Sequence, residues 1–228
     1  MKLFVIEGLD GAGKSTQIKL LRDFYTSQGY ICEYIHFPRT GAPFFGELVA
    51  RFLRGEFGSV HEVDPYLVAM LYAGDRKDAS KTISEWLKNN RVVLLDRYTY
   101  SNIAYQCAKI SEADRREELK NWILKLEFEH FGIPKPDLNF ILKVPFAFTE
   151  NKLSAKRSGD DRNYLNGGTD IHENNLNFQK RVMEIYLEVA ERDERLEVIN
   201  CSSHDGEMLP PEDIFRKIVE IIKNRDLL

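Results

Sequence analysis

The chain has 228 residues, of which 43% are hydrophobic and 30% are charged, and its formal net charge is −4. These values are typical of a globular protein and suit a single α/β domain over residues 1–228. The net charge argues against broad binding to nucleic acid, and no apolar run is long enough to cross a membrane. The N-terminus lacks the pattern of an export signal and the cysteines are few and scattered, so we expect a cytoplasmic protein with reduced thiols.

The strongest motif lies at the start of the chain. An apolar run at residues 3–6 leads into Gly8-Leu9-Asp10-Gly11-Ala12-Gly13-Lys14-Ser15-Thr16, and apolar residues at helical spacing follow. This arrangement is that of a phosphate-binding loop, whose backbone N–H groups surround a polyphosphate at the start of a helix. We expect the phosphates to be bound by Gly8, Gly11, Ala12, Gly13, Lys14, Ser15 and Thr16. The Ser15 hydroxyl is also expected to bind Mg²⁺.

Beyond the loop, predicted strands alternate with predicted helices. Further strands are expected at residues 30–35, 91–96, 137–142 and 196–199. Helices are expected at residues 44–53, 65–89, 101–108, 112–131, 145–156, 173–193 and 211–224. The long helix after Asp64 is expected to break near Ala79 and Ser80 and to pack Leu67, Met70 and Leu71 inward. Such alternation predicts a three-layer α/β sandwich around a five-stranded parallel sheet, with ligands at the carboxyl ends of the strands.

Charged side chains gather at the predicted ends of the first three strands, namely Asp10, Lys14, Arg39, Asp96 and Arg97. An aspartate that ends an apolar strand, as Asp96 does, is suited to hold Mg²⁺ through water together with Ser15, and the alternative is a helix cap. Arg39 and Arg97 carry planar guanidinium groups that match a phosphate, and the alternative for each is a surface ion pair. These residues predict a site for a nucleotide and its metal ion.

Two further segments are candidates for the same site. Tyr72 and Arg76 are four residues apart on one predicted helix, where they suit stacking and hydrogen bonding of a nucleobase, with Gly74 removing bulk nearby. Packing of the tyrosine and solvation of the arginine is the alternative. A loop at about residues 154–168 carries basic side chains between glycines, namely Lys156, Arg157 and Arg162. It is either a solvated charge run or a mobile basic lid that closes over a transferring phosphoryl group.

Taken together, these motifs resemble the thymidylate kinases, a branch of the P-loop nucleoside-monophosphate kinases. The resemblance extends over essentially the whole chain, and its specific parts are Ile6 to Gln17, Phe37-Pro38-Arg39, Tyr72 with Asp75-Arg76, and Asp96-Arg97-Tyr98 followed by Ser101, Ala104, Tyr105 and Gln106. It implies transfer of the γ-phosphoryl group of ATP to thymidine monophosphate (dTMP) with Mg²⁺, giving dTDP for dTTP biosynthesis. It also implies the nucleoside-monophosphate kinase fold and a homodimer.

The resemblance assigns roles residue by residue. It implies that dTMP is bound by Asp10, Arg39, Tyr72, Arg76, Arg97, Ser101 and Tyr105. Asp10 then contacts the sugar 3′-hydroxyl, Tyr72 stacks on thymine, and Arg76 donates to a thymine carbonyl. The family places a catalytic arginine either in the phosphate-binding loop or in the lid. Because that loop position is Gly11 here, the resemblance implies the lid arrangement, with catalysis by Lys14, Arg97, Arg157 and Arg162.

Two other interpretations of the function remain open from the sequence. One is a kinase for another nucleoside monophosphate or for a deoxynucleoside, which would need a base to deprotonate its hydroxyl acceptor. The other is a regulatory P-loop module that binds GTP or ATP. Against a GTP-binding module, the chain has no Asn-Lys-x-Asp motif, because Asn151-Lys152 continues into Leu153-Ser154.

Overall fold

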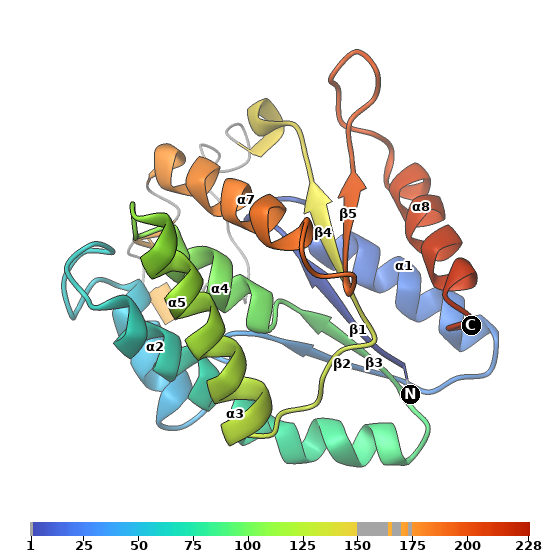
Figure 1. The fold of residues 1–228 in the computed structure, drawn as a ribbon. Coiled ribbons are helices and arrows are strands. Elements are labelled where there is room, and N and C mark those ends of the chain that lie inside the picture. Colours follow the sequence, from blue (N-terminus) through green and yellow to red (C-terminus); the bar gives the residue numbers. More distant parts are fainter. Residues whose placement is uncertain (1, 150–163, 166–169, 173–174) are drawn as a thin grey trace.

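The computed structural model describes residues 2–149, 164–165, 170–172 and 175–228. Its centre is a five-stranded sheet in the order β2-β3-β1-β4-β5, and every neighbouring pair of strands is parallel. The strands are β1 (Lys2–Glu7), β2 (Cys32–His36), β3 (Val92–Asp96), β4 (Leu138–Lys143) and β5 (Leu196–Asn200). Helices cover both faces of the sheet, which confirms the predicted three-layer α/β sandwich (Figure 1).

The alternation of side chains along β1 explains the two helical layers. Phe4 and Ile6 point into a core with α1 (Lys14–Ser27) and α8 (Pro211–Asn224). Leu3 and Val5 point to the opposite face, where α3 (Pro65–Lys88) packs. That face also carries α4 (Thr99–Cys107), α5 (Ala113–Leu124) and α7 (Leu176–Ala190), while α2 (Phe45–Leu53) packs on α3. A strand buried on both faces reads as a continuous apolar run, as this one does.

The predicted break in α3 is wrong. The helix is continuous because Ala79 and Ser80 are small residues on its buried face, and the Ser80 hydroxyl donates to the carbonyl of Lys77 within the helix. The predicted inward face is wrong for Leu67 and Met70, which are 56% and 42% exposed, whereas Leu71 is partly buried and packs against the residues of α2 as expected. Smaller residues such as Val68 and Ala69 face inward instead, because α2 and α4 cross α3 closely.

The predicted helix at residues 112–131 changes character part-way. It is α-helical to Leu124 and then continues as a π-helix, η1 (Lys125–His130). Of the predicted helix at 145–156, residues 145–149 are described, and residues 146–149 are helical. The predicted lid lies almost entirely outside the described residues. No helix in the described part of the chain is long and apolar enough to cross a membrane. All three cysteines are free.

The loop after β1 has the backbone that its glycines predict. Gly8, Gly11 and Gly13 have φ angles of 138°, 76° and 87°, which residues other than glycine rarely adopt. A Cβ atom at Gly8 would also lie 3.1 Å from the carbonyl oxygen of Leu142 in the neighbouring strand β4. Glycine is therefore required at this position both by backbone conformation and by space.

Candidate active site

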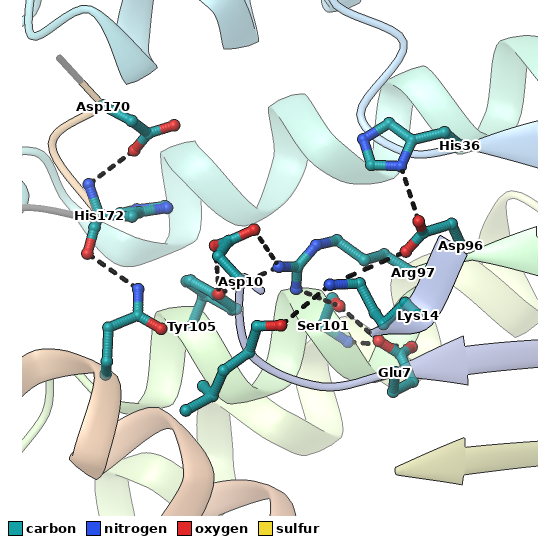
Figure 2. A network of polar contacts seen from close by, with 12 residues as sticks. Glu7, Asp10, Lys14, His36, Asp96, Arg97, Ser101, Tyr105, Asp170 and His172 are labelled. Atoms are coloured by element: carbon teal, nitrogen blue, oxygen red, sulfur yellow. Dashed lines mark hydrogen bonds and ion pairs between the residues drawn. The ribbon is translucent and has the colours of Figure 1, made fainter. Parts of the chain in front are cut away.

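The carboxyl ends of β1, β2 and β3 meet at one edge of the sheet. In the parallel register Ile6 lies beside Asp96, and Asp96 lies beside His36. The phosphate-binding loop leaves β1 at this edge, which brings Lys14 next to Asp96 (Figure 2). The predicted convergence of the three strand ends is therefore found in the structure.

Lys14 and Asp96 form the inner part of the site. The Lys14 ammonium donates to the carbonyl oxygen of Leu9 at 3.0 Å and lies 4.0 Å from Oδ1 of Asp96. On the other side, Nδ1 of His36 lies 3.3 Å from Oδ2 of Asp96. Burial alone would raise the pKa of Asp96, but Lys14 and His36 together hold this pKa below its ordinary value. Asp96 is thus a buried, ionised carboxylate.

The residues at this edge fit a magnesium ion. Oδ1 of Asp96 is buried and has no hydrogen-bond partner among the residues that the structure describes. Ser15 is exposed in the first turn of α1. No group of three or more His, Cys, Asp or Glu side chains in the described residues is placed to hold a metal ion by itself. This donor set suits Mg²⁺, which keeps several waters and binds proteins through one or two side chains together with substrate phosphates.

Arg97 links the loop to the neighbouring helix. Its Nη2 donates to Oδ1 of Asp10 at 2.9 Å and lies 3.3 Å from the Tyr105 hydroxyl, which donates to Oδ2 of Asp10 at 3.2 Å. Its Nη1 lies 3.3 Å from the hydroxyl oxygen of Ser101 (Figure 2). Burial lowers the pKa of a guanidinium, but the Asp10 carboxylate outweighs this effect and raises the pKa of Arg97 well above its ordinary value.

Glu7 holds the turn on which Arg97 lies. Arg97 has a φ of 67°, a left-handed conformation that is strained for a side chain of this size. Glu7 is fully buried and accepts hydrogen bonds from the backbone N–H groups of Tyr98 and Ser101 at 3.0 and 3.2 Å. It also accepts from the hydroxyls of Ser101 and Tyr186. Burial raises the pKa of Glu7 above its ordinary value, although each of these donors lowers it. Sequence reasoning missed this residue, whose signal was an acid at the end of an apolar strand.

A pocket opens beside Arg97. It joins the end of the phosphate-binding loop to side chains from α3 and α4. Its lining residues are Asp10, His36, Phe37, Pro38, Thr40, Leu53, Tyr72, Arg76, Arg97, Tyr98, Ser101, Asn102, Tyr105, Gln106, Tyr164, Asp170 and His172. Six of the seven residues expected to bind dTMP are among them, and Arg39 is the seventh.

Comparisons with known proteins identify the family. The thymidylate kinase family model matches residues 6–208. The chain belongs to the thymidylate kinase family. Thymidylate kinase from Mycobacterium tuberculosis (strain ATCC 25618 / H37Rv) is 33% identical over 189 residues, covering 82% of this chain and 85% of its own. A probable thymidylate kinase from Thermococcus onnurineus is 32% identical over 229 residues, covering 96% of each chain.

A solved structure agrees with these relatives. Thymidylate kinase from Candida albicans superposes with a TM-score of 0.73 at 26% sequence identity, covering 99% of this chain and 92% of that one. The Candida albicans enzyme has broad substrate specificity. The fold of the described residues is accordingly that of a thymidylate kinase.

In this member of the thymidylate kinase family, Arg39 is bound to α3. Its Nε donates to Oδ1 of Asp75 at 2.9 Å, its Nη2 donates to the Asp75 carbonyl at 2.8 Å, and its backbone N–H donates to Oδ2 of Asp75 at 2.8 Å. Its neighbours Pro38 and Thr40 line the pocket. Arg39 therefore lies at the pocket's edge, held by Asp75.

Arg76 lies in the pocket wall as part of a buried cluster. It is 1% exposed, and its Nε and Nη2 each donate to the carboxylate of Glu127 at 2.6 Å. Burial lowers the pKa of Arg76, but Glu127 outweighs this effect and raises it above the ordinary value. The role expected for Gly74 is wrong, since a Cβ atom there would lie 2.4 Å from the ring of Phe45. Gly74 makes room for the crossing of α2 over α3, and it does not line the pocket.

Asp170 and His172 complete the pocket and were missed from the sequence. Oδ1 of Asp170 accepts the backbone N–H of His172 at 2.7 Å (Figure 2). Its Oδ2 accepts the Tyr164 hydroxyl at 2.6 Å. The His172 ring packs 5.0 Å from the Tyr105 ring, and burial lowers its pKa well below the ordinary value, so the imidazole is neutral. These residues lie in a loop without periodic pattern, which carried no signal. The expected lid residues Lys156, Arg157 and Arg162 lie outside the described residues.

Proposed function

We propose that the protein transfers the γ-phosphoryl group of ATP to dTMP, giving ADP and dTDP for dTTP biosynthesis. Membership in the thymidylate kinase family makes the chain a nucleoside-monophosphate kinase, an ATP:dTMP phosphotransferase. The observation that carries this conclusion is a continuous pocket that joins Arg97, beside the phosphate-binding loop, to the aromatic and basic wall at Tyr72 and Arg76. Such a pocket fits a nucleotide with its phosphate toward the loop and its base toward α3.

On the donor side, the loop binds the phosphates of ATP. The backbone N–H groups of residues 8–16 and the Lys14 ammonium contact the phosphates. The match in fold to a thymidylate kinase structure supports placing ATP at this loop. The proposal includes Mg²⁺ held by Ser15 and, through water, by Asp96. It is supported by Oδ1 of Asp96, which is buried and has no hydrogen bond within the described residues. When bound, the ion neutralises charge on the phosphates. No general base is required, because the acceptor phosphate is already an anion.

On the acceptor side, charged side chains exchange partners with the substrate. Arg97, which is bound to Asp10 and Ser101, is proposed to bind the acceptor phosphate together with Arg39. Asp10 and Tyr105 then contact the sugar, since they lie on the pocket side of Arg97. Tyr72 stacks on the base, and Arg76 donates to its carbonyl. Positioning and neutralisation of charge by these groups supply most of the catalysis.

The remaining proposals rest mainly on sequence. Arg157 and Arg162 are proposed to act from a basic lid at about residues 154–168, because the loop position that carries an arginine in other members is Gly11 here. A homodimer is supported by the exposed apolar side chains of Leu67 and Met70 on α3. A cytoplasmic location is supported by the three free cysteines.

A panel of acceptors tests the proposed function. ADP release is measured with ATP, Mg²⁺ and one acceptor at a time, namely dTMP, dUMP, dCMP, dGMP or thymidine. We expect dTMP to give the highest kcat/KM and thymidine to give none. Faster release with thymidine than with dTMP would establish a nucleoside kinase instead, and slow ATP hydrolysis that ignores every acceptor would establish a regulatory module.

A further inference from the structure

The carboxylate of Glu127 is the centre of a closed polar cluster behind the pocket. Glu127 lies in η1, is fully buried, and receives four hydrogen bonds from two other helices. Its Oε2 accepts from Nε of Arg76 at 2.6 Å and from the Thr99 hydroxyl at 2.8 Å. Its Oε1 accepts from Nη2 of Arg76 at 2.6 Å and from Nδ2 of Asn102 at 3.0 Å. Each carboxylate oxygen thus has two donors.

Stability alone does not explain an acid at this position. Leu119, Ile123 and Glu127 follow one another at intervals of four residues on the buried face of α5 and η1, where the helical pattern calls for an apolar side chain. A buried ion pair contributes little net stability compared with apolar residues of similar volume, because both charges must lose their hydration. Such a pair is better explained by what it does to its neighbours.

For Arg76, the effect of Glu127 is to fix the plane of the guanidinium. Two of its three nitrogens, Nε and Nη2, are committed to the carboxylate, which leaves Nη1 for a ligand in the pocket that Arg76 lines. A guanidinium is a donor and never an acceptor. The wall at this point therefore offers a fixed donor, which matches a carbonyl oxygen and opposes an amino group.

For Asn102, Glu127 fixes the orientation of the side-chain amide. Nδ2 donates to Oε1 of Glu127 and to the carbonyl of Ala69, both at 3.0 Å. Oδ1 is buried with no hydrogen-bond partner in the described part of the chain, and Asn102 lines the pocket. A carboxylate accepts but does not donate, so it forces the amide nitrogen toward itself and leaves the oxygen as the free acceptor.

We propose that Glu127 is a positioning residue that sets the base preference of the enzyme, acting through Arg76 and Asn102. It orders one donor and one acceptor in the pocket wall, which selects a pyrimidine that carries a carbonyl beside a ring N–H over one that carries an amino group beside a bare ring nitrogen. The inference rests on the proposed function, since it concerns the base of the acceptor nucleotide. The π-helical turn η1 is the element that brings this carboxylate between α3 and α4.

The substitution Glu127→Gln tests the inference. Glutamine keeps the volume but replaces one accepting oxygen with a donating NH₂ group, so Arg76 or Asn102 must turn away. We expect the KM for dTMP to rise about tenfold and the preference for dTMP over dCMP, as a ratio of kcat/KM, to fall about tenfold. The KM for ATP should stay unchanged. A calorimetric Kd for dTMP without ATP should weaken by the same factor as the KM.

Two further variants separate positioning from general damage. Lys77→Met removes the hydrogen bond of 2.6 Å from α3 to the carbonyl of Phe131 at the end of η1, outside the pocket, and should leave the base preference unchanged. Thr99→Val removes one donor to Glu127 without leaving a buried charge unpaired, and Thr99 does not line the pocket. We expect it to weaken dTMP binding and the base preference in the same direction, by about threefold. This variant provides the test if Glu127→Gln does not fold.

The outcomes are distinct. A folded Glu127→Gln protein with wild-type preference for dTMP over dCMP overturns the inference, and so does an equal loss with both acceptors. If Glu127→Gln does not fold, a wild-type preference in Thr99→Val overturns it as well. If the wild-type protein fails to phosphorylate dTMP, the proposed function has failed, whatever the variants do.

Discussion

The two ends of the pocket, which we propose to bind the phosphate and the base of the acceptor, differ in how exposed their ion pairs are. At the phosphate end, the side chains of Arg97 and Asp10 are 10% and 25% exposed and meet at 2.9 Å. At the base end, the side chains of Arg76 and Glu127 are 2% and 0% exposed and meet at 2.6 Å. The first pair is open to a ligand that competes for either partner, whereas the second is sealed by hydrogen bonds from Thr99 and Asn102.

This difference suits the ligand groups that we propose for the two ends. A phosphate is itself charged, so the residues that bind it must be able to give up protein partners and take the substrate instead. A nucleobase is neutral and is recognised by the order of donors and acceptors along its edge, so the groups that read it must not move. The ion pair of Arg97 and Asp10 thus keeps charged groups available to the substrate, whereas the ion pair of Arg76 and Glu127 holds a hydrogen-bond donor in a fixed position.

The largest expected effect lies at the phosphate end. Lys14→Ala should lower kcat by about a thousandfold, because it removes a charge from the phosphates where negative charge must be stabilised. Circular dichroism and the melting temperature should stay close to those of the wild type. Turnover like that of the wild type would remove Lys14 from the mechanism, and with it the account of this end of the pocket.

The next effect concerns the geometry of Arg97. Arg97→Lys keeps the charge but loses the fork that reaches Asp10 and Ser101 together, so kcat/KM for dTMP should fall about a hundredfold. Steady-state kinetics with dTMP varied at saturating ATP measures this ratio. Full activity in the lysine variant would mean that only charge matters at the phosphate end.

At the base end, Arg76→Ala should affect binding and stability together. The KM for dTMP should rise about thirtyfold, by loss of a charged hydrogen bond, while the KM for ATP should change little. Removing the partner of a buried carboxylate is also expected to cost about 3 kcal/mol of folding stability. Equal changes in the two KM values, or an unchanged melting temperature, would contradict the contrast between the two ends.

The smallest expected effect concerns Lys109, whose buried amino group, unlike Arg97 and Arg76, has no carboxylate hydrogen-bonded to it in the described residues. Nζ of Lys109 is buried, lies 4.9 Å from the centre of the Phe52 ring, and has no hydrogen-bond partner among the described side chains and backbone. Burial lowers the pKa of Lys109 from 10.5 to about 7. The folded protein therefore binds fewer protons than the unfolded chain between these pH values, so the contribution of Lys109 to stability rises with pH over this window.

The variant Lys109→Met should accordingly be more stable than the wild type at pH 6, by about 3 °C in Tm. The difference in Tm between the variant and the wild type should be smaller at pH 9, because the wild-type lysine has then lost its proton in the folded state. Thermal unfolding of both proteins at the two pH values measures this difference. A difference that does not depend on pH would show that Lys109 stays charged when folded.

The residues of the phosphate end could be predicted from the sequence because they either form one contiguous motif or stand at the end of an apolar strand. Glycines, lysine and serine between residues 8 and 15 form one local motif, and Asp96 ends a run that reads as a buried strand. The parallel sheet and the start of α3 at Asp64 followed from equally local signals, and the Asp64 side chain caps the helix as expected. Local rules succeed where a feature depends on neighbours in the chain.

The base end was only half visible for the opposite reason. Arg76 was identified, but its partner Glu127 lies 51 residues away on another helix, and no local spacing pairs the two residues. Its signal was a charged residue on an otherwise apolar helix face. Gly74 was misread because the close approach of Phe45 is a property of how α2 crosses α3. His172 depends on rings from three separate segments, including Phe52 and Tyr105, which only the folded chain brings together.

The central place of β1 has a consequence for how the protein is made. Val5 pairs with Leu95 on one side and with Asn139 on the other, so the first strand is paired on both sides only after more than half of the chain has left the ribosome. Until then the apolar run before the nucleotide loop is exposed, and pairings this distant in sequence form slowly. The segment that defines the enzyme is thus synthesised first and completed late, and nucleotides add stability only once the sheet has closed around it.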